Sequence, residues 1–169
     1  MHFGPIRLPF AGGALHSGAA LLAIRVVMGP MLAYHGWKKL DGGVEKFVAT
    51  VDKYGFPFPD LLAWATIAIE LVGGICLALG LLTRLWAALA TVQFLLITAQ
   101  VKWDVGVFSS GGRSGFELDL MYAVTAAALL LAGPGLLALD HWLGLEEKPG
   151  AEDAAPEPEG VRIGGRSAG

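Results

Sequence analysis

Residues 61–101, LLAWATIAIELVGGICLALGLLTRLWAALATVQFLLITAQV, decide the fold, because they contain only two charged side chains, Glu70 and Arg84. A membrane-spanning helix needs about 20 mostly apolar residues, so this stretch is long enough for two. Gly80 weakens the end of the first helix, and Arg84 prefers the headgroup region of a bilayer. We therefore predict spans at about 61–82 and 84–103, with a turn between them.

Two further apolar stretches flank this region. One covers about 16–37 and is interrupted only by Arg25, and the other covers about 117–139, where Glu117 and Asp119 are the only charges. The whole chain is 54% hydrophobic and 16% charged, with a mean hydropathy of +0.58, whereas a soluble domain carries about 25% charged residues. The sequence therefore predicts an all-α integral membrane protein, a four-helix bundle formed by residues 1–145.

The charges are unevenly distributed along the chain. Residues 1–145 carry nine acidic and nine basic side chains, and residues 146–169 carry six acidic and three basic ones. A neutral body argues against nucleic-acid binding, which needs a basic surface, and the single Cys76 excludes a disulfide-stapled domain. Residues 146–169 are rich in Glu, Pro and Gly, so we predict a disordered acidic tail. The apolar stretch at 16–37 lacks a convincing cleavage site and is expected to remain as the first span.

The first connection, residues 38–60, carries a pattern of its own. Apolar side chains recur at helical spacing opposite charged ones, which predicts a short amphipathic helix in the membrane interface; the apolar set is Val44, Phe47, Val48 and Val51. For the span starts, we expect Asp60 to cap the second helix, Thr83 the third, and the stretch Ser114–Glu117 to form a capping box before the fourth.

Arg25 and Glu70 are the two charges placed nearest the middle of their spans. An isolated charge at the bilayer centre costs about 2.5–3.5 kcal/mol on insertion scales. If the first two spans are antiparallel neighbours, the two charges meet at the same depth, and we therefore predict an Arg25–Glu70 ion pair. Either the pair is structural and fixes helix register, or it forms part of a polar pocket for a ligand or proton.

Other polar side chains are expected to converge on the end of the bundle that carries the first and third connections. His35 and Lys39 follow Arg25 at helical spacing, and His35 is a candidate for proton transfer. Lys102 and Asp119 belong to the same end. The complete set of predicted ligand-binding residues is Arg25, His35, Lys39, Glu70, Gln93, Gln100, Glu117 and Tyr122. The alternative roles are interhelical hydrogen bonding for the two amides, capping for Glu117 and an interfacial position for Tyr122.

Several chemistries are disfavoured by the residue inventory. A bis-histidine haem needs two histidines at similar depth, and His35 lies at the opposite end of the bundle from His16 and His141. A thiol relay needs a second cysteine beside Cys76. Cys/His clusters typical of metal sites are absent from the sequence, so we expect no metal site.

In combination, these motifs resemble the DoxX family of small bacterial membrane proteins over about residues 18–143. The resemblance rests on Arg25, Gly29, His35-Gly36, Lys39-Leu40, Tyr54-Gly55, Pro57, Glu70, Gly73-Gly74, Gly80, Thr83-Arg84, Glu117, Gly133-Pro134-Gly135 and Leu139-Asp140. It implies a four-helix membrane protein related to the DoxD thiosulfate:quinone oxidoreductase subunit. It also implies association, in some bacteria, with a membrane oxidoreductase complex. The acidic tail and the Gly/Ser-rich loop 104–114 depart from the family, so partner contacts do not carry over.

Two functions follow from this resemblance and the predicted cavity. The first is a redox-associated subunit that handles a quinone or a small sulfur compound. The second is a non-catalytic scaffold that recruits a soluble oxidoreductase. The expected environment is the bacterial cell membrane, with both termini on one side and a homo-oligomer or soluble redox enzyme as partner. Five basic residues on the terminal side against six on the other do not decide orientation, and the cytoplasmic side is the expectation for the termini.

Overall fold

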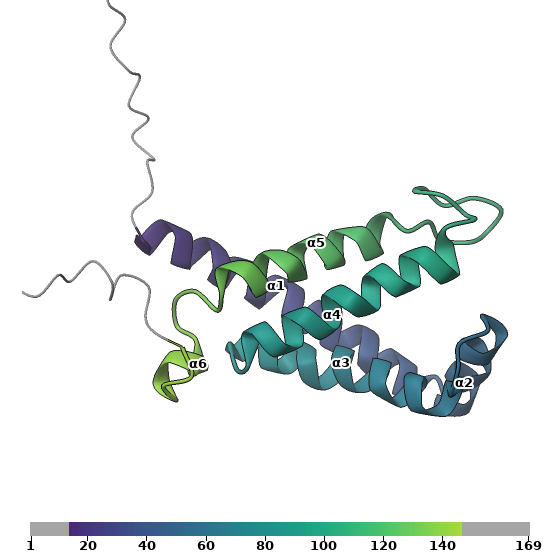
Figure 1. Cartoon of the computed structure of the whole chain (residues 1–169), viewed down its shortest axis with the longest axis horizontal. Coiled ribbons are helices and arrows are strands. Elements are labelled where there is room, and N and C mark those ends of the chain that lie inside the picture. The colour runs from purple at the N-terminus through teal and green to yellow at the C-terminus, as the bar shows by residue number, and fades with distance from the viewer. Residues whose placement is uncertain (1–13, 147–169) are drawn as a thin grey trace, which may run out of the picture.

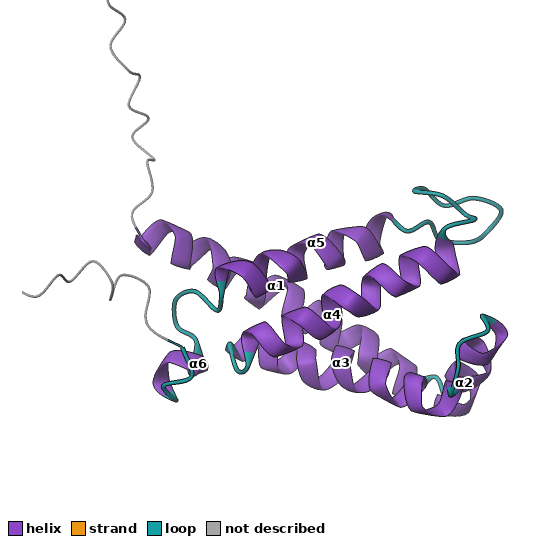
Figure 2. Cartoon of the chain, viewed as in Figure 1, coloured by secondary structure: helices purple, strands orange, loops and turns teal. Residues whose placement is uncertain are grey.

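The computed structural model describes residues 14–146, and within them the chain is helical. Its elements are α1 (Ala14–Asp41), α2 (Val44–Lys53), α3 (Pro59–Leu79), α4 (Thr83–Ile97), α5 (Glu117–Ala132) and α6 (Leu139–Trp142). A π-helical turn, η1 (Thr98–Lys102), continues α4. Figure 2 shows no strand in the described part of the chain, where the isolated bridge Ser110–Arg113 is all the β pairing present. The all-α prediction is confirmed.

Three described segments are long and apolar enough to cross a membrane: Ser17–Asp41, Pro59–Leu79 and Thr83–Lys102. They overlap the first three predicted spans, and helices of this length and composition are those of a multi-pass membrane protein. The fourth predicted span is shorter than expected, because α5 has 16 residues, about 24 Å of helix. It ends where Gly133 adopts φ +82 before Pro134. A fourth crossing therefore stays a prediction.

The long helices α1, α3, α4 and α5 run in alternating directions along the molecule (Figure 1). The start of α1 and the segment around α6 lie at one end, where the amide of Leu136 donates to the carbonyl of Gly18. Helix α2 and the loop between η1 and α5 lie at the other end, here called the loop end. The core between the helices contains Met28, Leu32, Leu77, Phe94 and Leu129 among others.

The helix starts differ from the predicted caps. Pro59 is the first residue of α3, so Phe58 and not Asp60 is its N-cap. Phe116 is the N-cap of α5, and the predicted capping box does not form because the amide of Glu117 donates to the carbonyl of Val107. Helix α4 begins at Thr83, so Leu82 and not Thr83 is its N-cap, and the amide of Thr83 donates to the carboxylate of Asp140 on α6.

Helices α1 and α3 pack closely through glycines, as expected for small residues at membrane helix interfaces. A Cβ added to Gly74 would lie 2.7 Å from the carbonyl oxygen of Gly29 and 2.9 Å from Cα of Ala33. Both contacts are with backbone atoms, so no side-chain rotation can relieve them. A residue without a Cβ is therefore required at position 74 for α1 and α3 to pack this closely.

Replacing Gly74 by alanine is therefore expected to destabilise the folded protein by about 1–3 kcal/mol, the usual cost of overpacking. Unfolding of the purified protein in detergent, followed by circular dichroism, measures this loss. Ala68→Val adds bulk at an exposed position of the same helix and is expected to leave stability nearly unchanged. Equal effects of the two substitutions would contradict the close α1–α3 contact.

The predicted amphipathic helix in the first connection is confirmed as α2, which has no fully buried residue. The predicted disordered tail lies outside the described residues except for Glu146, whose carboxylate accepts a hydrogen bond of 2.6 Å from Nε of Arg84.

Candidate functional site

A cavity of about 570 Å³ opens between α2, α3, α4 and α5 at the loop end of the molecule. Most of its lining is aliphatic or aromatic. Apart from Thr50, Tyr54 and Thr66, the polar and charged side chains of the lining come from α1, α3, α4, η1 and α5. They are His35, Lys39, Glu70, Gln93, Lys102, Asp119 and Tyr122. Such a cavity, apolar with a few convergent polar groups, is typical of a small-molecule site.

Glu70 is the centre of the first polar cluster. Its side chain is only 2% exposed, and one carboxylate oxygen accepts a hydrogen bond from Lys39. The other oxygen accepts a bond of 2.8 Å from Nε2 of Gln93. Pairing and hydrogen bonding together offset the cost of burying this carboxylate. The amide oxygen of Gln93 is buried and has no hydrogen-bond partner within residues 14–146.

Tyr122 brings an aromatic surface to the same cavity. Its ring stacks on Phe94 with centroids 4.8 Å apart, and His35 packs edge-on against it at 5.9 Å. The hydroxyl of Tyr122 is buried and lacks a hydrogen-bond partner in the described part of the chain. A buried polar atom without a partner is uncommon in folded proteins. The hydroxyl therefore keeps an unused capacity to donate a hydrogen bond.

A second ion pair, Lys102–Asp119, also lines the cavity. Lys102 is the last residue of the π-helical turn, and the Asp119 side chain is 9% exposed. The sequence placed both residues at the loop end but did not include them among the ligand candidates. The signal that points to Asp119 is its spacing of three residues from Tyr122, which puts both on one face of α5.

The predicted Arg25–Glu70 ion pair is wrong. Gly29 lies against Ala78 and Gly36 against Leu71, and this register puts Glu70 opposite residue 37, about 18 Å along α1 from Arg25 at ~1.5 Å per residue. Arg25 is fully buried and its Nη2 donates to the carbonyl of Leu136 at 2.6 Å. Helix α1 also extends to Asp41, beyond the predicted end at residue 37.

Gln100 and Glu117 do not join the cavity. Both side chains are exposed, and neither residue is part of the cavity lining. Gln93 and Gln100 were expected on one face because seven residues separate them, but the π-helical turn at Thr98–Lys102 changes the helical register between them. Glu117 is the first residue of α5.

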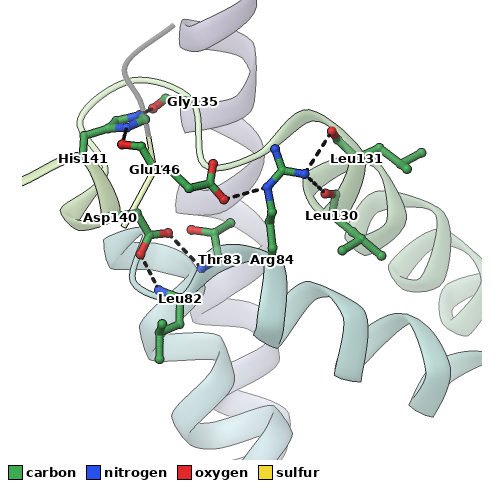
Figure 3. A network of polar contacts seen from close by, with 9 residues as sticks. All are labelled: Leu82, Thr83, Arg84, Leu130, Leu131, Gly135, Asp140, His141 and Glu146. Atoms are coloured by element: carbon green, nitrogen blue, oxygen red, sulfur yellow. Dashed lines mark hydrogen bonds and ion pairs between the residues drawn. The ribbon is translucent and has the colours of Figure 1, made fainter. Parts of the chain in front are cut away.

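A separate polar network joins the α3–α4 turn to the segment after α5, at the end of the molecule opposite the loop end (Figure 3). The Asp140 carboxylate accepts hydrogen bonds of 2.6 and 2.9 Å from the amides of Leu82 and Thr83. Nη1 of Arg84 donates to the carbonyl of Leu130 at 2.8 Å, and Nε2 of His141 lies 2.7 Å from the carbonyl oxygen of Gly135. This network attaches the segment after α5 to the α3–α4 turn, so it is structural.

Arg113 and Asp104 close the base of the loop between η1 and α5. Nη1 of Arg113 donates to Asp104 at 2.5 Å and Nη2 to the carbonyl of Val101 at 2.9 Å. The hydrogen bond from Arg113 lowers the pKa of Asp104. The same bond raises the pKa of Arg113, with a smaller contribution from Tyr54 at the end of α2.

The lowered pKa of Asp104 predicts the pH range in which this loop contact persists. The Asp104 carboxylate stays charged until the pH falls below its ordinary value of 3.8, and the ion pair is lost only as the pH drops through the lowered pKa. A ¹³C NMR titration of Asp104 is expected to show a midpoint below 3.8 that rises toward it in Arg113→Gln. An unchanged midpoint in the variant would contradict the contact.

With this geometry established, the comparisons with known proteins assign a family. The sequence model of the DoxX family matches residues 20–103. The chain belongs to the DoxX family. A Bacillus subtilis (strain 168) protein named "Putative oxidoreductase CatD" is similar to it, with 28% identity over 131 residues that cover 76% of this chain and 90% of the relative. No solved structure matches the chain.

The DoxX match covers only part of the cavity. Lys39, Glu70 and Gln93 lie inside the matched range, whereas Asp119 and Tyr122 lie beyond it on α5. The Lys39–Glu70–Gln93 cluster thus lies within the part of the chain that matches the family model. No group of three or more His, Cys, Asp or Glu side chains suited to a metal occurs among residues 14–146.

Proposed function

We propose that this DoxX protein is a redox-associated membrane subunit that binds a quinone in the cavity. The observation that carries the proposal is an apolar cavity lined by Tyr122 and Gln93, whose hydroxyl and amide oxygen are buried and have no hydrogen-bond partner among residues 14–146. A quinone ring is flat and apolar and carries two carbonyl oxygens, so it matches the stacked Phe94 and Tyr122 rings and the donors beside them.

The residues in the cavity have distinct roles in this proposal. Lys39 and Tyr122 donate hydrogen bonds to the ring oxygens, and Gln93 offers its free amide oxygen to the hydroxyl of a reduced ring. Glu70 holds Lys39 in place, and His35 exchanges protons at the edge of the Tyr122 ring. A bound quinone supplies a carrier that takes up two electrons from a redox partner together with two protons.

A quinone fits the cavity better than a small sulfur anion does. Both cations in the cavity, Lys39 and Lys102, are already paired with carboxylates. An anion such as thiosulfate would enter a mostly apolar space without a free positive charge, and losing its hydration there is costly. The printed name of CatD, an oxidoreductase, supports a redox role without naming the substrate.

The alternative function is a non-catalytic scaffold for a soluble oxidoreductase. The pairing of each cation in the cavity favours it, because a purely structural network would also leave no charge free. Either function places the protein in a bacterial cell membrane, where a homo-oligomer or a soluble redox enzyme is the proposed partner and both termini share the cytoplasmic side.

Quinone binding is tested with the Tyr122→Phe variant. Removing a buried hydroxyl without a partner is expected to leave stability unchanged. If the hydroxyl holds a ring oxygen, affinity falls about tenfold, the effect of one hydrogen bond. The measurement is a titration of the full chain in lipid nanodiscs with a short-chain naphthoquinone and a short-chain benzoquinone, followed by tryptophan fluorescence.

The matched control is Tyr34→Phe, which removes the hydroxyl of an exposed tyrosine outside this cavity. It is expected to bind like the unmodified protein. Absence of saturable binding of both quinones, or identical affinity in Tyr122→Phe, would overturn the proposal. Saturable binding of thiosulfate in place of the quinones would assign the cavity to a sulfur compound.

A further inference from the structure

The cavity does not end at the polar cluster, because it extends as a groove between α3 and α4. These helices meet at the turn around Gly80–Leu82 and diverge toward the loop end (Figure 1). The groove is lined on α3 by Leu62, Ala65, Thr66 and Ile69, and on α4 by Leu85, Ala88, Leu89, Val92 and Leu96. Each set follows helical spacing, so each helix presents one apolar stripe to the groove.

The α4 stripe is both cavity wall and molecular surface. Leu85 is 51% exposed, Leu89 37%, Val92 58% and Leu96 46%, although all four line the cavity. Helix α4 belongs to a predicted membrane span, so the medium that meets these side chains is lipid. From Leu85 to Leu96 the stripe is about 16 Å long at ~1.5 Å per residue. The groove is therefore open sideways to the bilayer.

By contrast, α2 covers the cavity on the side that faces water. Helix α2 turns its apolar face to the cavity, to which Phe47, Val51 and Tyr54 contribute. The ammonium group of Lys39 lies 5.3 Å above the Phe47 ring, and the Asp104–Arg113 contact joins the neighbouring loop near Tyr54. An amphipathic helix in the interface with its apolar face inward separates the cavity from water.

We propose that the ligand reaches the cavity laterally from the bilayer, between α3 and α4, and that its apolar chain lies along the α4 stripe. This inference rests on the proposed quinone function for the ring and adds the class of molecule, a quinone with a long isoprenoid chain. The ring lies beside Glu70 and Gln93. The chain follows Val92, Leu89 and Leu85 toward the α3–α4 turn, where its surroundings remain apolar throughout.

The Leu89→Trp variant tests the path of the chain. A bulky ring at the edge of the groove is expected to weaken binding of a quinone with four isoprene units about tenfold. Binding of the same ring without a chain is expected to stay within about twofold, because the polar cluster is intact. Dissociation constants are measured in nanodiscs of one lipid composition, so partitioning of each quinone into lipid is the same for all variants.

Leu95→Trp is the matched control, since Leu95 is 48% exposed on the same helix but does not line the cavity. It is expected to bind both molecules like the unmodified protein. A quinone with a photoreactive group at the end of its chain is expected to label residues 85–92, and a ring-labelled one the region of Glu70 and Tyr122.

The outcomes separate this inference from the proposed function. Equal weakening of both quinones by Leu89→Trp, or of neither, would overturn the chain path while ring binding stands. Failure of both quinones to bind the unmodified protein would overturn both proposals. Loss of self-association in Leu89→Trp, measured by light scattering, together with unchanged quinone binding would assign the groove to a second copy of the chain and overturn the inference.

Discussion

Replacing Glu70 by alanine is expected to destabilise the folded protein by about 3–5 kcal/mol, the usual cost of removing one partner from a buried ion pair. The Lys39 side chain is only 23% exposed and would remain charged beside an apolar wall. The hydrogen bond from Gln93 would be lost as well. The free energy of unfolding is measured in mixed detergent micelles with increasing denaturing detergent.

The double variant Lys39→Met/Glu70→Ala is expected to recover most of that loss, because it leaves no unpaired charge. The exposed pair Lys38–Asp41, at 3.3 Å and about half exposed on both sides, supplies the control. Asp41→Ala is expected to change stability by less than about 0.5 kcal/mol. A similarly small effect of Glu70→Ala would mean that the Lys39–Glu70 pair is solvated and its burial unimportant.

The stable double variant also shows whether the Lys39–Glu70 pair takes part in quinone binding. If the variant binds quinone as tightly as the unmodified protein, the pair serves only the fold, and the ring is held by Tyr122 and Gln93. If it folds but its quinone affinity falls, the same pair that stabilises the helices also holds the ring. A membrane protein can use one ion pair for both purposes. Charge inside a membrane is costly, so it is usually found where it serves a function.

Local patterns in the sequence predicted the elements that depend on neighbouring residues. The apolar runs located α1, α3 and α4, and the spacing of Phe47 and Val51 located α2. Such patterns depend only on which face of a helix meets water or lipid. Pro134 likewise indicated where the last span bends or ends, and α5 stops at Ala132 just before it.

Features that depend on contacts between distant segments were not predictable. The depth at which Arg25 and Glu70 lie is set by glycine contacts between α1 and α3, such as Gly29 against Ala78. The sequence shows that these glycines permit close approach but does not show which residues face each other. Gln100 was misplaced for a related reason, because no sequence pattern announced the π-helical turn that contains it.

The sequence predicted those members of the candidate site whose helices bring them to the same depth. Lys39, Glu70, Gln93 and Tyr122 converge because α1, α3, α4 and α5 each contribute at least one polar side chain to the cavity lining. The cap of α4 illustrates the opposite case. Thr83 was a reasonable local cap, yet Asp140, 57 residues away in the chain, accepts the hydrogen bond from its amide.

Asp140→Ala is accordingly expected to be the most damaging substitution outside the cavity, with a loss of about 3–5 kcal/mol. Hydrogen bonds to a charged group contribute about 1.5–3 kcal/mol each, and Asp140 accepts two from the amides of Leu82 and Thr83. Its charge also interacts with the fully buried Arg25. Loss of the carboxylate would leave that guanidinium facing only the carbonyl of Leu136.

Two measurements check this expectation. The free energy of unfolding is expected to fall by the stated amount. Hydrogen exchange is expected to become faster at the amides of Leu82 and Thr83. A change confined to α6 would leave those two amides protected. Asp60→Ala is the control, because Asp60 lies exposed in the first turn of α3 without a described cap hydrogen bond. If Asp140→Ala costs no more than Asp60→Ala, the α3–α4 turn holds its shape without α6. The divergence of α3 and α4 that opens the groove would then originate in the turn itself, where Gly80 and Leu82 adopt left-handed φ values of +70 and +47.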